Sequence, residues 1–276
     1  MLPLWRDRLK IVLSPEHVTV VRLSSGFKQR EVFNKTMACA LPNQDEAAWQ
    51  PALRVMRQLL RQAGSVKANA EIIISNHFVR YQLVKAQADL GSLEEEQGFV
   101  RFSFTEVYGS EAARWSMRWG SGLDIAAQVA SAIDQGLIDG IVNIFSETGI
   151  KLISLQPYLM AAFNYVCKTI DAKPILFVLV EHGRLCIALL KDGDWQSLSS
   201  TKLSSDWAGE LPNVIEREVQ RIGTEATIGS ILLCLPDFFD HKRLVPENQS
   251  VRILTMSPET LHKRKVLSVA SVGVKS

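Results

Sequence analysis

Residues 9–23 read LKIVLSPEHVTVVRL, and residues 174–195 read PILFVLVEHGRLCIALLKDGDW. In each stretch, two apolar runs flank a short polar turn, at residues 14–16 (SPE) in the first and 181–183 (EHG) in the second. Apolar, β-branched runs around a turn predict a pair of antiparallel strands. Because the pattern recurs in the second half of the chain, we expect two related lobes that each begin with such a pair.

The same order of elements follows each strand pair. Each copy continues with a strand, a helix and a further strand, at residues 30–41, 45–63 and 71–75 in the first copy and at 195–203, 211–222 and 228–235 in the second. Strand-strand-strand-helix-strand is the plan of ribonuclease-H-like folds. The predicted fold class is therefore α/β, with two ribonuclease-H-like (actin-like) lobes, each a mixed sheet in the order βββαβ plus helices.

Both helices have recognisable start signals. In the first helix we expect Asp45 as the N-cap, and one face carries the large apolar side chains Trp49, Leu53, Met56 and Leu60. In the second helix we expect Pro212 in the first turn, where a proline is tolerated.

The segment between the two copies predicts an inserted subdomain. It combines strands at 78–84, 114–119, 125–132 and 151–155 with helices that begin after Ser92 and at 133–147 and 157–170. We predict an N-terminal lobe at 1–170 with an inserted α/β subdomain at about 85–150, a C-terminal lobe at 171–260 and a basic tail at 261–276.

The composition is that of a globular protein with balanced charge. Of the 276 residues, 47% are apolar, which is enough for a sizeable core, and the formal net charge of +2 does not favour nucleic-acid binding. Four cysteines lie alone in apolar runs, as expected for reduced thiols. With no signal-peptide pattern and no apolar run of spanning length, we expect a cytoplasmic protein that reaches a membrane only through a partner.

The turns lack the chemistry that an actin-like ATPase requires. Such an enzyme needs a carboxylate near the first strand of each lobe to hold the metal ion, and glycine-rich turns whose N–H groups approach the phosphates. The first turn instead presents Ser14 and Pro15, and proline removes a backbone donor. The second turn presents Glu181 and Gly183, with Arg184 adding bulk where a phosphate is expected. We therefore predict no catalytic residues, no cofactor and no metal site.

Other catalytic sites have less support. The five histidines show no metal-ligand spacing, and the polar cluster of Asp237, Asp240 and His241 is more typical of a solvated loop than of a metal site. Trp115 and Trp119 share one strand face, which indicates core packing more than stacking on nucleic-acid bases. The enzymatic alternative that stays open is a divergent actin-like ATPase or sugar-kinase-like enzyme, in which Glu181, Asp237 or Asp240 replaces the missing acids.

Four segments together resemble a known family. They are residues 9–23, residues 71–84 (EIIISNHFVRYQLV), residues 133–164, which end in GIKLISLQPYLMAAFN, and residues 174–195. Their order is similar to that in the PilM/GspL-like proteins of type IV pilus and type II secretion assembly, which share an actin-like ATPase fold. The resemblance covers residues 9–235 and rests on the order of the predicted elements and on a few short stretches of similar sequence.

The chain departs from this family at its phosphate-binding positions. Where PilM-like proteins carry an aspartate and a glycine before the first phosphate turn, this chain places Val12 and Ser14. Where they carry a lysine on the second strand, it places Thr19, and the second-lobe turn reads EHGRL. The resemblance therefore implies a degenerate, non-ATPase member.

The resemblance also implies a function and partners. It points to a non-catalytic cytoplasmic scaffold of a pilus or secretion-type machine, which binds the short cytoplasmic tail of an inner-membrane protein. A hexameric secretion ATPase is a further implied partner, and a homo-oligomer stays open.

Overall fold

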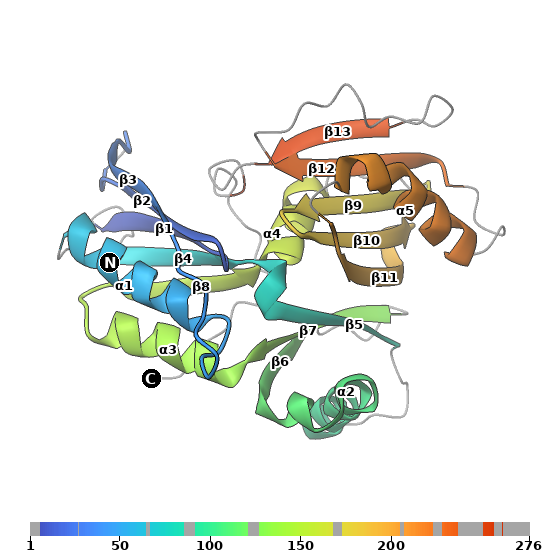
Figure 1. Ribbon diagram of the computed structural model, residues 1–276, viewed down its shortest axis with the longest axis horizontal. Helices are drawn as coiled ribbons and strands as arrows, with labels where there is room; N and C mark the ends of the chain where they lie inside the picture. Colours follow the sequence, from blue (N-terminus) through green and yellow to red (C-terminus); the bar gives the residue numbers. More distant parts are fainter. Residues whose placement is uncertain are drawn as a thin grey trace.

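The computed structural model describes residues 6–26, 28–64, 67–85, 92–120, 127–167, 173–204, 207–222, 228–236, 251–256 and 261. It has two five-stranded sheets and a smaller three-stranded sheet (Figure 1). Among the helices in these ranges, none combines the length and the apolarity needed to cross a bilayer.

The first sheet has the strand order β3-β2-β1-β4-β8. Its strands are β1 (Asp7–Leu13), β2 (His17–Leu23), β3 (Glu31–Ala38), β4 (Ala68–Ile74) and β8 (Lys151–Pro157). The first three strands pair antiparallel, whereas β4 runs parallel to both β1 and β8. Helices α1 (Gln50–Ala63) and α3 (Gln135–Ser146) lie side by side on one face of this sheet (Figure 1).

The second sheet repeats this topology in the order β11-β10-β9-β12-β13. Its strands are β9 (Ile175–Glu181), β10 (Arg184–Lys191), β11 (Asp194–Lys202), β12 (Ser230–Pro236) and β13 (Val251–Met256), with α5 (Trp207–Ile222) on one face (Figure 1). The pairings have the same directions as in the first sheet. The predicted fold class is therefore confirmed, and β13 is a strand that the sequence did not predict.

The third sheet is inserted after the first βββαβ unit. It joins β5 (Val79–Lys85), β6 (Trp115–Trp119) and β7 (Ala127–Asp134) in the order β5-β7-β6. Helix α2 (Leu93–Tyr108) packs on it and starts with the expected Ser92 cap, which forms a capping box with Glu95. The third sheet thus begins ahead of residue 85, and α3 belongs with α1 on the first sheet.

Two expected helix starts are wrong. Helix α1 begins at Gln50 with Trp49 at the N-cap position, not Asp45, because Pro51 lies in its first turn and is best placed there. Helix α5 begins at Trp207, so Pro212 lies inside the helix. Burial of Trp207 and Leu211 against the second sheet extends this helix toward its N-terminus.

One continuous core joins the two lobes. It holds Leu9 and Ile11 of β1 together with Phe177 and Leu179 of β9, and burying each such side chain contributes about 1.5–3 kcal/mol. Helix α4 (Tyr158–Val166) lies between the lobes, where the Phe163 ring contacts the rings of both Phe177 and Trp195 (Figure 1). The lobes are therefore packed against one another through shared apolar contacts.

The two strand tryptophans pack in a separate small core. The Trp115 ring meets those of Phe104 and Tyr108 edge-on, and Trp119 donates its indole N–H to Glu96. Both belong to the cluster between α2 and the third sheet, so the expected core packing is confirmed.

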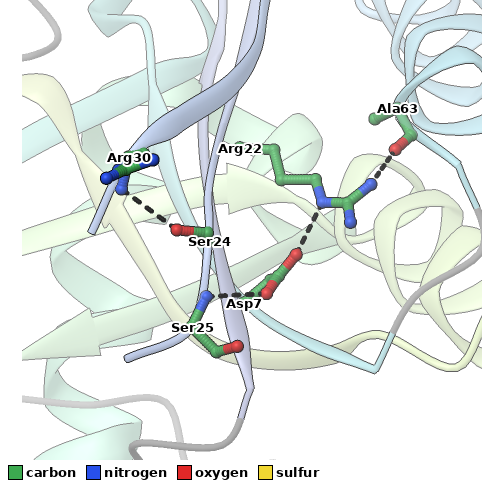
Figure 2. A network of polar contacts seen from close by, with 6 residues as sticks. All are labelled: Asp7, Arg22, Ser24, Ser25, Arg30 and Ala63. Atoms are coloured by element: carbon green, nitrogen blue, oxygen red, sulfur yellow. Dashed lines mark hydrogen bonds and ion pairs between the residues drawn. The ribbon is translucent and has the colours of Figure 1, made fainter. Parts of the chain in front are cut away.

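A polar network holds together the start of β1, the end of β2 and the end of α1 (Figure 2). Arg22 donates to an Asp7 carboxylate oxygen at 2.7 Å and to the Ala63 carbonyl oxygen at the end of α1 at 2.5 Å. The other Asp7 oxygen accepts the Ser25 N–H at 2.8 Å. Burial alone would raise the pKa of Asp7, but the hydrogen bonds and the charge of Arg22 lower it. One arginine therefore ties β1 and β2 to α1.

Replacing this arginine tests the network. We expect Arg22→Ala to lower the free energy of unfolding by about 2 kcal/mol, because Asp7 and the Ala63 carbonyl lose their partner. Arg57→Ala is the matched control, since Arg57 lies 3.6 Å from Glu147 with both side chains exposed, and should cost about 0.5 kcal/mol or less. Urea denaturation measures both, and equal losses would contradict the role given to Arg22.

Candidate binding cleft between the lobes

A cavity of about 190 Å³ lies where the two strand pairs face each other. The turn after β1, the end of β4 and the turn after β9 form most of its wall. Its apolar lining is Val12, Pro15, Ile73, Tyr158, Val180, Met256 and Leu261. Its polar lining is Ser14, Glu16, His17, Ser75, His77, Glu181 and His182. Both predicted turns therefore meet at one site.

Side chains join the two lobes across this cleft. A Glu181 carboxylate oxygen accepts the backbone N–H of Asn76 at 3.0 Å, and His77 Nε2 lies 2.8 Å from the His182 carbonyl oxygen. His182 Nδ1 is also within hydrogen-bond distance of a Glu16 carboxylate oxygen. Each contact links the first lobe to the turn between β9 and β10, so the turns are tied to each other.

Asn76 holds the first-lobe side of this junction in place. Its side chain is fully buried, and its Oδ1 accepts the Tyr81 hydroxyl at 2.6 Å and the Leu159 N–H at 3.0 Å. The short helical turn of Asn76–Phe78 is further closed by the Ser75 hydroxyl, which accepts the His77 N–H. These bonds connect β4, β5 and α4, and they aim the Asn76 N–H at Glu181.

The electrostatics of Glu181 follow from its position. Burial raises its pKa, and the Ser75 hydroxyl, the His77 charge and the Asn76 N–H oppose that rise without cancelling it. A carboxylate held in this way is already engaged by protein donors. It would also repel an incoming phosphate at short range.

Some of the predicted turn residues line the cavity, and others point away from it. Ser14 and Pro15 line the cavity, and the Ser14 hydroxyl closes its own turn by donating to the His17 carbonyl oxygen at 2.7 Å. Thr19 and Arg184 do not line the cavity. Thr19 Oγ1 lies 2.8 Å from Thr36 Oγ1 on the exposed surface, and Arg184 donates to Ser200 at 3.3 Å.

Gly183 has a defined conformational role. Its φ is +69°, a left-handed value that glycine adopts without strain, and a Cβ atom there would lie 3.5 Å from the His77 ring. A contact at that distance is ordinary, so the left-handed backbone of the turn, and not the space beside His77, favours glycine at this position.

From the sequence, residues 75–77, which join the lobes from the first-lobe side, are interpreted as a turn and not as a fragment of a catalytic triad. Residues 75–77 follow an apolar strand directly, and that position at a strand end was the available signal. Within the described ranges, no group of three or more His, Cys, Asp or Glu side chains could hold a metal ion. The cluster of Asp237, Asp240 and His241 lies outside these ranges.

Comparison with solved structures places this architecture among known folds. A Bacteroides thetaiotaomicron protein with an actin-like ATPase fold and unknown function matches with a TM-score of 0.59 and 10% identity, over 95% of this chain and 98% of that one. The chain has an actin-like fold.

Two further structures of this fold come from assembly systems. The cytoplasmic domain of EpsL, an inner-membrane component of the Vibrio cholerae type II secretion system, matches with a TM-score of 0.58 and 10% identity, over 92% of each chain. The PilM–PilN type IV pilus biogenesis complex matches with a TM-score of 0.53 and 16% identity, over 79% of this chain and 71% of that one. No protein-family model and no curated protein matches the sequence.

Two substitutions at Glu181 separate its hydrogen bond from its charge. Glu181→Ala should lower the free energy of unfolding by about 1–3 kcal/mol, because the Asn76 N–H loses its acceptor. Glu181→Gln keeps an acceptor oxygen and removes a partly buried charge that desolvation disfavours, so its cost should stay below about 1 kcal/mol. Urea denaturation of both variants tests this. If Glu181→Gln lowers the free energy of unfolding as much as Glu181→Ala does, the charge itself stabilises the junction.

His17 predicts a dependence of stability on pH. Burial lowers its pKa, the Glu16 charge opposes this and the His182 charge adds to it. Below about pH 6.5 the unfolded chain therefore binds a proton that the folded state resists, so stability is lost as the pH falls. We expect His17→Asn to flatten the decline in the unfolding midpoint between about pH 7 and 5. An unchanged slope would contradict the assignment.

Proposed function

We propose that this chain is a non-catalytic cytoplasmic scaffold of a pilus or secretion-type assembly machine, which binds the cytoplasmic tail of an inner-membrane partner. The observation that carries the proposal is that the protein's own residues bridge the two lobes across the cleft. Glu181, His182 and His77 make their contacts at the two turns where an actin-like ATPase needs open phosphate sites.

These contacts between the lobes and within the turns leave few hydrogen-bond donors free to bind a metal-bound triphosphate. The Asn76 N–H is bonded to Glu181, and the Ser14 hydroxyl and N–H both bond to the His17 carbonyl oxygen. Half of the cavity-lining residues are apolar. Bringing phosphates there would desolvate them against apolar walls and beside a carboxylate, which is costly without compensating donors.

The comparisons supply the biological setting of the proposal. The EpsL match is described as part of a secretion system at the inner membrane, and the PilM match is described as a complex with PilN. The shared fold spans 92% of this chain for EpsL and 79% for PilM, which supports an assembly role.

A divergent ATPase remains the competing function, and Glu181 is its most suitable acid. A catalytic Glu181 would have to exchange its bond to Asn76 for a water or metal contact. Phosphate release above background that disappears in Glu181→Ala, while Glu181→Gln stays folded, would favour that enzyme over the scaffold.

Copurification with a membrane protein tests the scaffold directly. The chain is coexpressed with a single-span inner-membrane protein encoded beside its gene, in detergent, and complexes are measured by size exclusion with light scattering. We expect a stable complex that is lost when the partner's cytoplasmic tail is deleted. A complex that survives the deletion, or none with any neighbouring single-span protein, would contradict the proposal. The measured mass also shows whether the chain self-associates.

A further inference from the structure

Three cationic side chains gather where the third sheet meets the second lobe. Arg184 of β10 lies directly opposite Lys202 of β11 in the antiparallel register, so both point to the same face. Arg80 lies at the start of β5, and β5 packs against β11. We call Arg80, Arg184 and Lys202 the basic cluster.

The acid nearest in register to the basic cluster is Glu181, opposite Arg184 on β9, and it already accepts the Asn76 N–H. In the described part of the chain, none of its three side chains has a carboxylate oxygen within ion-pair distance. Arg80 donates to the carbonyl oxygens of His77 and Val79, and Arg184 donates to the Ser200 hydroxyl at 3.3 Å. The guanidinium charges are therefore held in place by neutral acceptors.

Arg184 is partly buried and lies near a second cation, so its positive charge is destabilised unless an anion is close to it. Its Nε atom is buried and has no partner among the described residues. Burial and then the charge of Arg80 lower its pKa, against weaker support from neighbours that include Glu181. Like charges held close together and partly desolvated are stabilised when an anion binds between them.

The site is open to solvent on one side. Ser200 and Lys202 at the end of β11 are both exposed, whereas Arg80 and Arg184 are half-buried. A ligand could therefore reach the cluster along β11 without separating the lobes.

We propose that the basic cluster binds carboxylates of an acidic peptide segment, such as a partner's cytoplasmic tail would present. This inference rests on the proposed scaffold function and assigns part of its binding surface. Arginine forks bind carboxylates in a bidentate way, and single negative charges spaced along a peptide can meet three cations one at a time. A polyphosphate concentrates its charge at one place and is less well matched to three cations spread over two strand pairs.

Fluorescence anisotropy with a fluorescein-labelled hexaglutamate peptide, at low ionic strength, tests the inference. Hexaglutamine of the same design is the neutral control. We expect hexaglutamate to bind and hexaglutamine not to, with an affinity that falls as salt is added. Arg184→Gln should weaken binding about tenfold or more, and Lys202→Gln about threefold, since Lys202 is exposed.

Arg61→Gln is the matched control, because Arg61 is an exposed arginine at the far end of α1, and it should change the affinity less than about twofold. Lys202→Gln keeps the test valid if Arg184→Gln fails to fold. Equal binding by wild type and Lys202→Gln, or binding of pyrophosphate but not of hexaglutamate, overturns the inference. If hexaglutamate fails while the tail-dependent membrane complex forms, the inference fails and the proposed function stands.

Discussion

The hydrogen bond from the Asn76 N–H to Glu181 is the contact on which the cleft depends. It connects the end of β4 in the first lobe to the end of β9 in the second, and it satisfies a backbone donor and a largely enclosed carboxylate together. Losing either partner would leave a buried polar group unpaired, which costs more than the bond itself contributes. The two lobes are therefore coupled at the two turns where the sequence analysis looked for phosphate-binding sites.

The surrounding packing supports this coupling. Helix α4 places Phe163 against Phe177 and Trp195, so the lobes share an apolar core beneath the polar junction. Asn76 is fixed from behind by Tyr81 and by the Leu159 N–H at the start of α4. A change at the cleft would thus have to move β5 and α4 together, which makes this junction a stiff element of the fold.

The sequence predicted most of the fold, because repeated apolar runs and turn signals mark each copy of the βββαβ unit. It did not predict β13, and it placed two helix starts wrongly, because Pro51 and the burial of Trp207 decide those starts through position and packing. For the site, the sequence identified Ser14, Pro15 and Glu181, which do line the cavity. It could not place Arg184 and Thr19, whose directions depend on the partner strands, nor pair Asn76 with Glu181, since that contact joins residues 105 positions apart.

The central claim is that the two turns, joined by the protein's own contacts, do not bind a nucleotide. Isothermal titration of Mg-ATP into the full chain near neutral pH tests it most directly. The account predicts no saturable heat up to about millimolar nucleotide, the range in which binding free energies become marginal. Saturable binding of one nucleotide per chain at micromolar strength would contradict it.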